Sequence, residues 1–155
     1  MQVGDIMHTD VKTADADDTF VDVAKMMRTN GISSVVVLHK TGKLAGIVTE
    51  RDIVHLVAAG GDPHSVKVAL GMTRRLATIG PKVDIAEAAD HMVSLNIRHL
   101  PVVDRGKVVG IVSIRDLTKW AAEELAGGHE MPDIARSQKA LKAASELQKQ
   151  RRLSS

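Results

Sequence analysis

The sequence predicts an α/β protein that consists of two copies of a β-α-β-β-α unit followed by a helical tail. The first observation is an internal repeat in the 155-residue chain: Gly46–Ile53 returns as Gly110–Leu117. The second is an upstream match between Ile32–Val37 and Ile97–Val102, at an offset of 65 (97 − 32) rather than 64 (110 − 46). A turn that is one residue shorter in the second copy explains the difference. The third is the alternation of β-branched runs with runs of helical periodicity.

The first copy extends over residues 5–60. Its elements follow in the order strand, helix, strand, strand, helix, predicted over residues 11–13, 20–30, 33–38, 44–49 and 51–59. Asp18 or Thr19 is a suitable N-cap for the first helix, and Asn30-Gly31 ends it. The turn residues 40–43 between two β-branched runs predict a hairpin.

The second copy extends over residues 68–126, after a linker at 61–67. It repeats the same order of elements, predicted over residues 76–78, 84–95, 100–103, 108–113 and 115–125. Each copy alone would have a three-stranded sheet with two helices on one face, which is too little to bury both faces of the sheet. Two copies that pack face to face solve this problem.

Residues 127–155 form a basic tail, separated from the second copy by Gly127-Gly128 and Pro132. Asp133–Leu153 is rich in good helix formers, and we expect a helix that packs on the body or on a partner. Its apolar residues recur at roughly heptad spacing: Ile134, Leu141, Ala144 and Leu147. A solvated extension is the alternative.

Composition restricts the class of protein. Apolar residues make up 44% of the chain but aromatic residues only 1%, so the core must consist of Val, Ile, Leu, Met and Ala. The absence of cysteine excludes disulfides and thiolate metal sites. No run approaches ~18 apolar residues and no signal peptide is evident at the N-terminus, so we expect a cytoplasmic protein without a membrane span.

Charge and motifs argue against several functions. The formal net charge is +2, and from His129 onward six basic residues face three acidic ones (+3), which leaves −1 for the body. This balance does not indicate nucleic-acid binding. The seven histidines show no spacing typical of a metal site. No pairing of a nucleophile with a base is visible, so we expect neither an enzyme nor a metal site.

Two segments at strand–helix junctions carry candidate chemistry: Thr49–Asp52 and Ser113–Asp116. Both fit a capping box, in which a hydroxyl and an acid three residues later satisfy the helix N-terminus. The same atoms suit a nucleotide, because a helix N-terminus favours phosphate and an acid there can accept from ribose hydroxyls. Gly46 and Gly110, just upstream, either let a flat ring approach the backbone or permit tight packing.

The duplicated pattern resembles a tandem pair of CBS domains, the family named after cystathionine β-synthase; such a pair is called a Bateman module. The resemblance rests on Ile97–Asp104 (IRHLPVVD) followed by Gly110–Asp116 (GIVSIRD), and on the matching segments of the first copy. It extends over residues 5–125. It implies that the two repeats pack about a pseudo-twofold axis and leave two clefts for adenosine-type nucleotides.

The resemblance also implies which residues form each cleft. One would combine residues of both copies as follows: Lys12, Ile32 and Ser33 with Ser113, Arg115 and Asp116. The other would combine Ala77, Ile97 and Arg98 with Thr49, Arg51 and Asp52. Asp52 and Asp116 would hold ribose, and the isoleucines would flank adenine. Arg98, with His99 beside it, would give the second cleft the more anionic ligand.

The function implied is that of a stand-alone regulatory module that binds AMP, ADP or ATP and signals by a change in conformation or oligomeric state. No cofactor would be required, and the partners would be the nucleotide, a second copy in a homodimer, and an unidentified regulated protein. Two alternatives remain. One is an S-adenosylmethionine module, although its sulfonium would be disfavoured beside Arg98 and Arg51; the other is a structural interaction module with unoccupied clefts.

Overall fold

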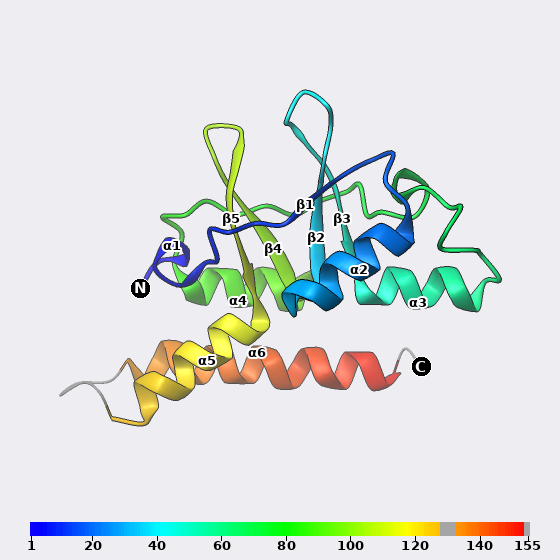
Figure 1. Ribbon diagram of the computed structural model, residues 1–155. Helices are drawn as coiled ribbons and strands as arrows, with labels where there is room; N and C mark the ends of the chain where they lie inside the picture. Colours follow the sequence, from blue (N-terminus) through cyan, green and yellow to red (C-terminus); the bar gives the residue numbers. More distant parts are fainter. Residues whose placement is uncertain (128–132, 154–155) are drawn as a thin grey trace. The chain divides into compact units, whose positions relative to one another are not determined.

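The computed structural model describes residues 1–127 and 133–153, so Gly128 and Pro132 of the expected tail boundary lie outside the described residues. The elements are as follows (Figure 1): α1 (Val3–Ile6), β1 (Thr13–Asp15), α2 (Phe20–Asn30), β2 (Ser34–Leu38), β3 (Leu44–Thr49), α3 (Glu50–Ala58), the 3-10 turn η1 (Val68–Leu70), α4 (Ile85–Ser94), β4 (His99–Asp104), β5 (Lys107–Ser113), α5 (Ile114–Leu125) and α6 (Ile134–Leu153). The mixed α/β class and both copies of the repeat are therefore confirmed.

The chain forms two compact units. The repeat-1 unit comprises Asp10–Ala77 with Arg105–Val108. The repeat-2 unit comprises Met1–Thr9, Thr78–Asp104 and Val109–Ser155. Residues 1–9, of which 5–9 lie within the predicted bounds of the first copy, thus belong to the compact unit of the second.

The repeat-1 unit contains the three-stranded sheet that its sequence predicts. The strand order is β1-β2-β3, with β1 parallel and β3 antiparallel to β2. Thr19 is the N-cap of α2, and its hydroxyl oxygen accepts from the Asp22 N–H at 3.3 Å. Gly31 ends the helix with φ of +63°, a conformation that glycine adopts without a steric penalty.

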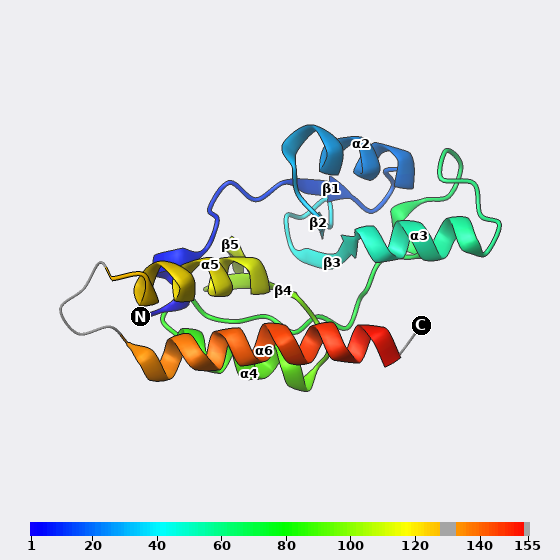
Figure 2. The same ribbon diagram turned by 90° about the horizontal axis from the view of Figure 1, so that it is seen from below.

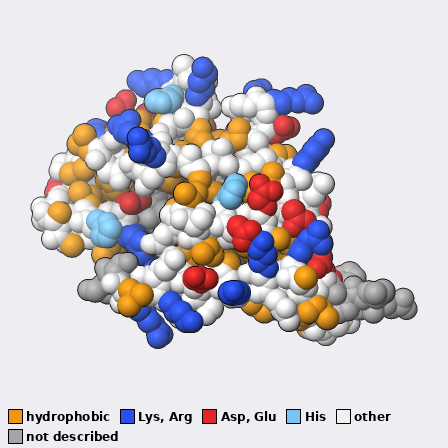
Figure 3. Space-filling model, turned by 180° about the vertical axis from the view of Figure 1, so that it is seen from behind, with side chains coloured by type: hydrophobic (Ala, Val, Ile, Leu, Met, Phe, Trp, Pro, Cys, Tyr) orange, Lys and Arg blue, Asp and Glu red, His pale blue; other side chains and the backbone are white. Residues whose placement is uncertain are grey.

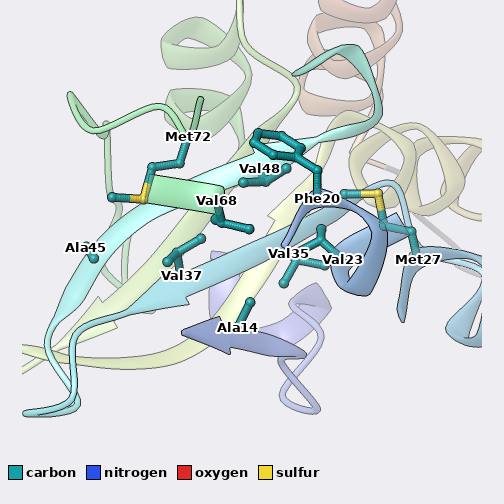
Figure 4. Close-up of a cluster of buried hydrophobic side chains, with 10 residues drawn as sticks. All are labelled: Ala14, Phe20, Val23, Met27, Val35, Val37, Ala45, Val48, Val68 and Met72. Carbon is teal, nitrogen blue, oxygen red and sulfur yellow. The ribbon is translucent and has the colours of Figure 1, made fainter. Parts of the chain in front are cut away.

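The core of the repeat-1 unit is aliphatic, as the composition predicts (Figure 4). It contains the single phenylalanine of the chain, Phe20, which is almost fully buried. The remaining members are small or aliphatic side chains and two methionines: Ala14, Val23, Met27, Val35, Val37, Ala45, Val48, Val68 and Met72. Burial of each large side chain in such a cluster stabilises the fold by about 1.5–3 kcal/mol.

The prediction of a third strand over residues 76–78 in the second copy is wrong. In the described part of the chain, the sheet of the repeat-2 unit has two strands, β4 and β5. In place of the third strand there is a single parallel bridge, in which the Val103 N–H donates to the Ile79 carbonyl at 2.8 Å. The pairing does not extend upstream over residues 76–78, because Pro101 of β4 has no N–H to donate to the Ala77 carbonyl; at the matching position of the first copy, the Val36 N–H donates to the Lys12 carbonyl at 3.2 Å.

Each unit also contains a short segment that the sequence analysis did not assign. In the repeat-2 unit, His8 exchanges two backbone hydrogen bonds with Ile111 of β5, at 2.9 and 3.0 Å. In the repeat-1 unit, Thr73 exchanges two with Ile47 of β3, at 2.9 and 3.1 Å. His8 and Thr73 are 65 residues apart and Ile47 and Ile111 are 64 apart, so the bridging segment is itself duplicated.

The tail is a helix, as expected, and α6 lies along α4 and α5 (Figure 2). The face that it buries differs from the predicted heptad: Ser137, Ala140, Ala143 and Leu147 are buried, whereas Ile134 and Leu141 are 51% and 40% exposed. The small residues allow the helix backbones to approach closely. No helix in the described ranges is long and apolar enough to cross a membrane.

Candidate functional site

The two strand–helix junctions have the same capping geometry. In the repeat-2 unit, one carboxylate oxygen of Asp116 (Oδ2) accepts from the Ser113 N–H and hydroxyl, both at 2.7 Å. In the repeat-1 unit, Oδ2 of Asp52 accepts from the Thr49 N–H at 2.7 Å and from its hydroxyl at 3.1 Å. The capping box is therefore present at both helix N-termini. It uses one oxygen of each carboxylate and leaves Oδ1.

The two Oδ1 atoms have different surroundings. The His8 ring nitrogen Nε2 lies 2.9 Å from Oδ1 of Asp116, within hydrogen-bond distance. Among the residues that the structure describes, no donor is recorded for Oδ1 of Asp52. His8 lies 108 residues from Asp116 and was not among the site residues predicted from the sequence. The signal that could have identified His8 is the repeat offset of 65 residues, which aligns it with Thr73.

Arg98 and Ser33 occupy the same position in the two copies, beside the start of the closing helix of their own repeat. The Arg98 carbonyl accepts from the Ile114 N–H at 2.9 Å, and the Ser33 carbonyl accepts from the Glu50 N–H at 3.1 Å. The predicted site residues Arg98, Arg115 and Asp116 thus belong to one junction within the repeat-2 unit.

His99 shows the electrostatics of this junction. Burial, together with the positive charges of Arg98 and Arg115, lowers the pKa of the His99 imidazole to about 4, although Asp116 opposes the shift. His99 is therefore neutral at physiological pH. At the matching positions the repeat-1 junction has serines, Ser33 and Ser34, so the excess of positive charge belongs to the second copy.

Three further predicted site residues make contacts within their own unit. Ile32 and Ile97 follow α2 and α4, and their N–H groups donate to the Met27 and Met92 carbonyls. The Lys12 ammonium pairs with the Asp10 carboxylate at 2.8 and 3.0 Å.

The predicted clefts combine residues of the two units. Lys12, Ile32, Ser33, Thr49, Arg51, Asp52 and Ala77 belong to the repeat-1 unit. Ile97, Arg98, His99, Ser113, Arg115 and Asp116 belong to the repeat-2 unit. The assignment of these residues to two clefts stays a prediction.

Tight packing accounts for the duplicated glycines. A Cβ on Gly46 would lie 2.6 Å from the Met72 sulfur, and a Cβ on Gly110 would lie 2.5 Å from the Met7 sulfur. Real Cβ atoms do not approach other atoms so closely. Both methionines belong to the duplicated bridging segments, so each glycine provides space for a methionine beneath the junction.

Charged side chains at the surface are mixed in sign. On the face shown in Figure 3, Lys and Arg side chains lie among Asp and Glu side chains. Within the described ranges, no group of three or more His, Asp or Glu side chains lies close enough together to hold a metal ion.

The sequence of this chain is similar to those of known proteins. The sequence profile of the CBS domain matches residues 3–59 and 66–123. An uncharacterized protein of Methanopyrus kandleri, MK0525, is 37% identical over 119 residues, which are 76% of this chain and 61% of that protein. This chain therefore spans less than two thirds of the length of that relative.

Solved structures show the same fold. The CBS domain pair of protein MJ0100, in complex with 5′-methylthioadenosine and S-adenosylmethionine, is 28% identical with a TM-score of 0.75, over 80% of this chain and 98% of that one. A CBS domain protein of unknown function from Thermoplasma acidophilum, TA0289, is 25% identical with a TM-score of 0.76, over 94% and 76% of the two chains.

Proposed function

Because the chain belongs to the CBS domain family and contains two tandem repeats of it, we propose that it is a regulatory module that binds adenine nucleotides (AMP, ADP or ATP) in clefts between the repeats. The observation that carries the proposal is the duplicated junction, where Asp52 and Asp116 each use one carboxylate oxygen in a capping box. The adenosine-containing ligands of the MJ0100 pair support the same class of ligand.

The junctions have the chemistry that a nucleotide needs. A helix N-terminus favours phosphate through its free N–H groups and its dipole. Carboxylate oxygens accept from ribose hydroxyls, as acids do in dinucleotide-binding folds. Arg51 and Arg115, two residues into each helix, are available to pair with phosphate. Arg98 favours the more anionic ligand at a cleft that includes it, whereas the neutral His99 adds no charge there.

Regulation would proceed by a population shift, in which bound nucleotide stabilises one arrangement of the repeats over another. The sequence of the repeats shows no pairing of a nucleophile with a base. The bound nucleotide would therefore act through a regulated protein or through a change of oligomeric state in the cytoplasm. We place the homodimer contact on α3, where Val54 and Val57 are 63% and 56% exposed. The corresponding surface of α5 is covered by α6.

S-Adenosylmethionine is the second candidate ligand, because the MJ0100 pair binds it. Its sulfonium group is cationic and would be repelled in a cleft that contains both Arg98 and Arg51. An interaction module with empty clefts is the third possibility, in which Asp52 and Asp116 only cap their helices.

A thermal-shift titration with AMP, ADP, ATP and S-adenosylmethionine tests the proposal. A ligand at 100 times its Kd stabilises the folded state by about 2.7 kcal/mol. We expect Asp52→Ala and Asp116→Ala each to weaken nucleotide binding. Asp22→Ala is the matched control, because Asp22 forms the same capping box with Thr19 in α2, outside the proposed site. No shift with any of the four ligands at millimolar concentration would refute the proposal.

A further inference from the structure

The two proposed ribose carboxylates differ in one neighbour, which the duplicated bridging segments supply. His8 and Thr73 occupy equivalent positions, and each exchanges two backbone hydrogen bonds with the strand residue two positions before the capping hydroxyl. The backbone is therefore held in the same way in both units. The difference lies in the side chain at that position, imidazole in one copy and a short hydroxyl in the other.

Only the imidazole engages a carboxylate. With His8 at Oδ1 and Ser113 at Oδ2, both oxygens of Asp116 have a hydrogen-bond partner. No such second partner of Asp52 is recorded in the described part of the chain. A ribose hydroxyl that approaches Oδ1 of Asp116 therefore competes with a group of the protein itself, whereas at Oδ1 of Asp52 the described residues supply no such competitor.

We propose that His8 competes with ligand for Asp116, so that the Asp52 site fills first and the Asp116 site second. This inference rests on the proposed function. The His8 side chain is 68% exposed and that of Asp116 13%, so the imidazole can leave the carboxylate for solvent while its backbone stays paired with Ile111. An exposed pair of this kind is weak, and the competition lowers affinity at the Asp116 site by roughly twofold to fivefold.

Calorimetric titration with AMP of the full chain tests this order. The Asp52→Ala background leaves the Asp116 site to be measured. There His8→Thr, which installs the residue of the other copy, is expected to tighten AMP binding by roughly twofold to fivefold. In the Asp116→Ala background, the same substitution is expected to leave the remaining Asp52 site unchanged. Thr73→His, the converse change, is expected to weaken the Asp52 site.

An NMR titration of the wild-type protein with AMP provides a second test, in which His8→Thr serves only to assign the His8 signals. The ring resonances of His8 are expected to shift when AMP occupies the second site, because the imidazole leaves the carboxylate. Unchanged AMP affinity in His8→Thr would overturn the competition, and weaker binding would show instead that His8 orients Asp116 for the ligand. If wild-type protein and every variant fail to bind AMP, the proposed function fails and this inference fails with it.

Discussion

The closing helices of the two CBS repeats, α3 and α5, differ in how much surface they bury. None of the α3 residues is buried, whereas Leu117, Trp120 and Ala121 of α5 are buried. At equivalent positions, Val57 is 56% exposed and Ala121 is fully buried. The difference arises from α6, which packs on α5 and α4. The two repeats therefore share their closing helix, but α6, which lies outside the repeats, covers that helix only in the second one.

Charge explains why α6 suits the second repeat. Arg136 of α6 pairs with Asp84, the N-cap of α4, at 2.8 Å, and Lys139 of α6 pairs with Asp90 of α4 at 2.5 Å. The corresponding residues of the first repeat are Thr19 and Lys25, which offer no carboxylate. Arg136 also lowers the pKa of the Asp84 carboxyl by hydrogen bonding to it. A basic helix thus gains ion pairs on one repeat that the other cannot provide.

The largest expected effect is the loss of the covering contact. Leu147 of α6 is 2% exposed, and Leu147→Ala is expected to lower the free energy of unfolding by about 2–5 kcal/mol, since it leaves a cavity against the second repeat. Leu141→Ala on the same helix is the control, because Leu141 is 40% exposed and its truncation is expected to cost less than about 1 kcal/mol. Urea denaturation measures both. Equal losses would show that α6 does not pack as described.

The second expected effect is a pH dependence of stability that only the second junction contributes, through His99. Because the pKa of folded His99 is about 4 and that of an unfolded histidine about 6.5, the unfolded state binds more protons between these values. His99 therefore contributes stability above pH 6.5 that is lost as the pH falls toward 4, about 3 kcal/mol in all. His99→Ser, which installs the residue of the first repeat, is expected to flatten the stability–pH profile in this window. Parallel profiles would contradict the burial of a neutral imidazole.

The smallest expected effect compares the duplicated glycines. A Cβ on Gly46 would lie 2.6 Å from the Met72 sulfur and 2.9 Å from the Thr73 carbonyl oxygen. A methionine side chain can move aside, but a backbone carbonyl in a paired segment cannot do so cheaply. We expect Gly46→Ala to lower the free energy of unfolding by about 2–3 kcal/mol, and Gly110→Ala by about 1–2 kcal/mol. Urea denaturation measures both.

The geometric reason for this order is the carbonyl distance. At Gly110 the matching carbonyl, that of His8, is 3.1 Å from the added Cβ rather than 2.9 Å. Gly80→Ala is the control, since its nearest neighbour, Val83, is 3.7 Å away. It is expected to change stability by less than about 0.5 kcal/mol. A loss at Gly80 as large as that at Gly46 would show that backbone conformation, rather than contact, is responsible.

Local signals predicted most of the elements. The cap at Thr19, the glycine at position 31 and the β-branched hairpin runs lie in the sequence next to the elements that they define, and the structure confirms them. The prediction of an opening strand in the second repeat was wrong because a strand exists only where a partner pairs with it, and Pro101 of the neighbouring strand lacks the N–H that Val36 supplies in the first repeat. The buried face of α6 was also misjudged, because its burial depends on α4 and α5 rather than on its own periodicity.

The candidate site was predictable only in part, for the same reason. Both capping boxes follow from a spacing of three residues, and both are present. The contact of His8 with Asp116 and the fit of Met7 over Gly110 join residues about a hundred positions apart, and no periodicity links them. They become visible when the repeat offset is applied to the bridging segments, which lie upstream of the predicted first strand of each repeat.

The bridging segments also determine how small a piece of this chain can be self-sufficient. If the chain is cut in the linker at 61–67, the first half keeps Gly46 but loses Met72, and the second half keeps Gly110 but loses Met7. Each half thus holds the methionine that belongs to the other. Neither half alone therefore contains a complete pair of glycine and methionine, so the smallest self-sufficient piece of this chain includes both repeats.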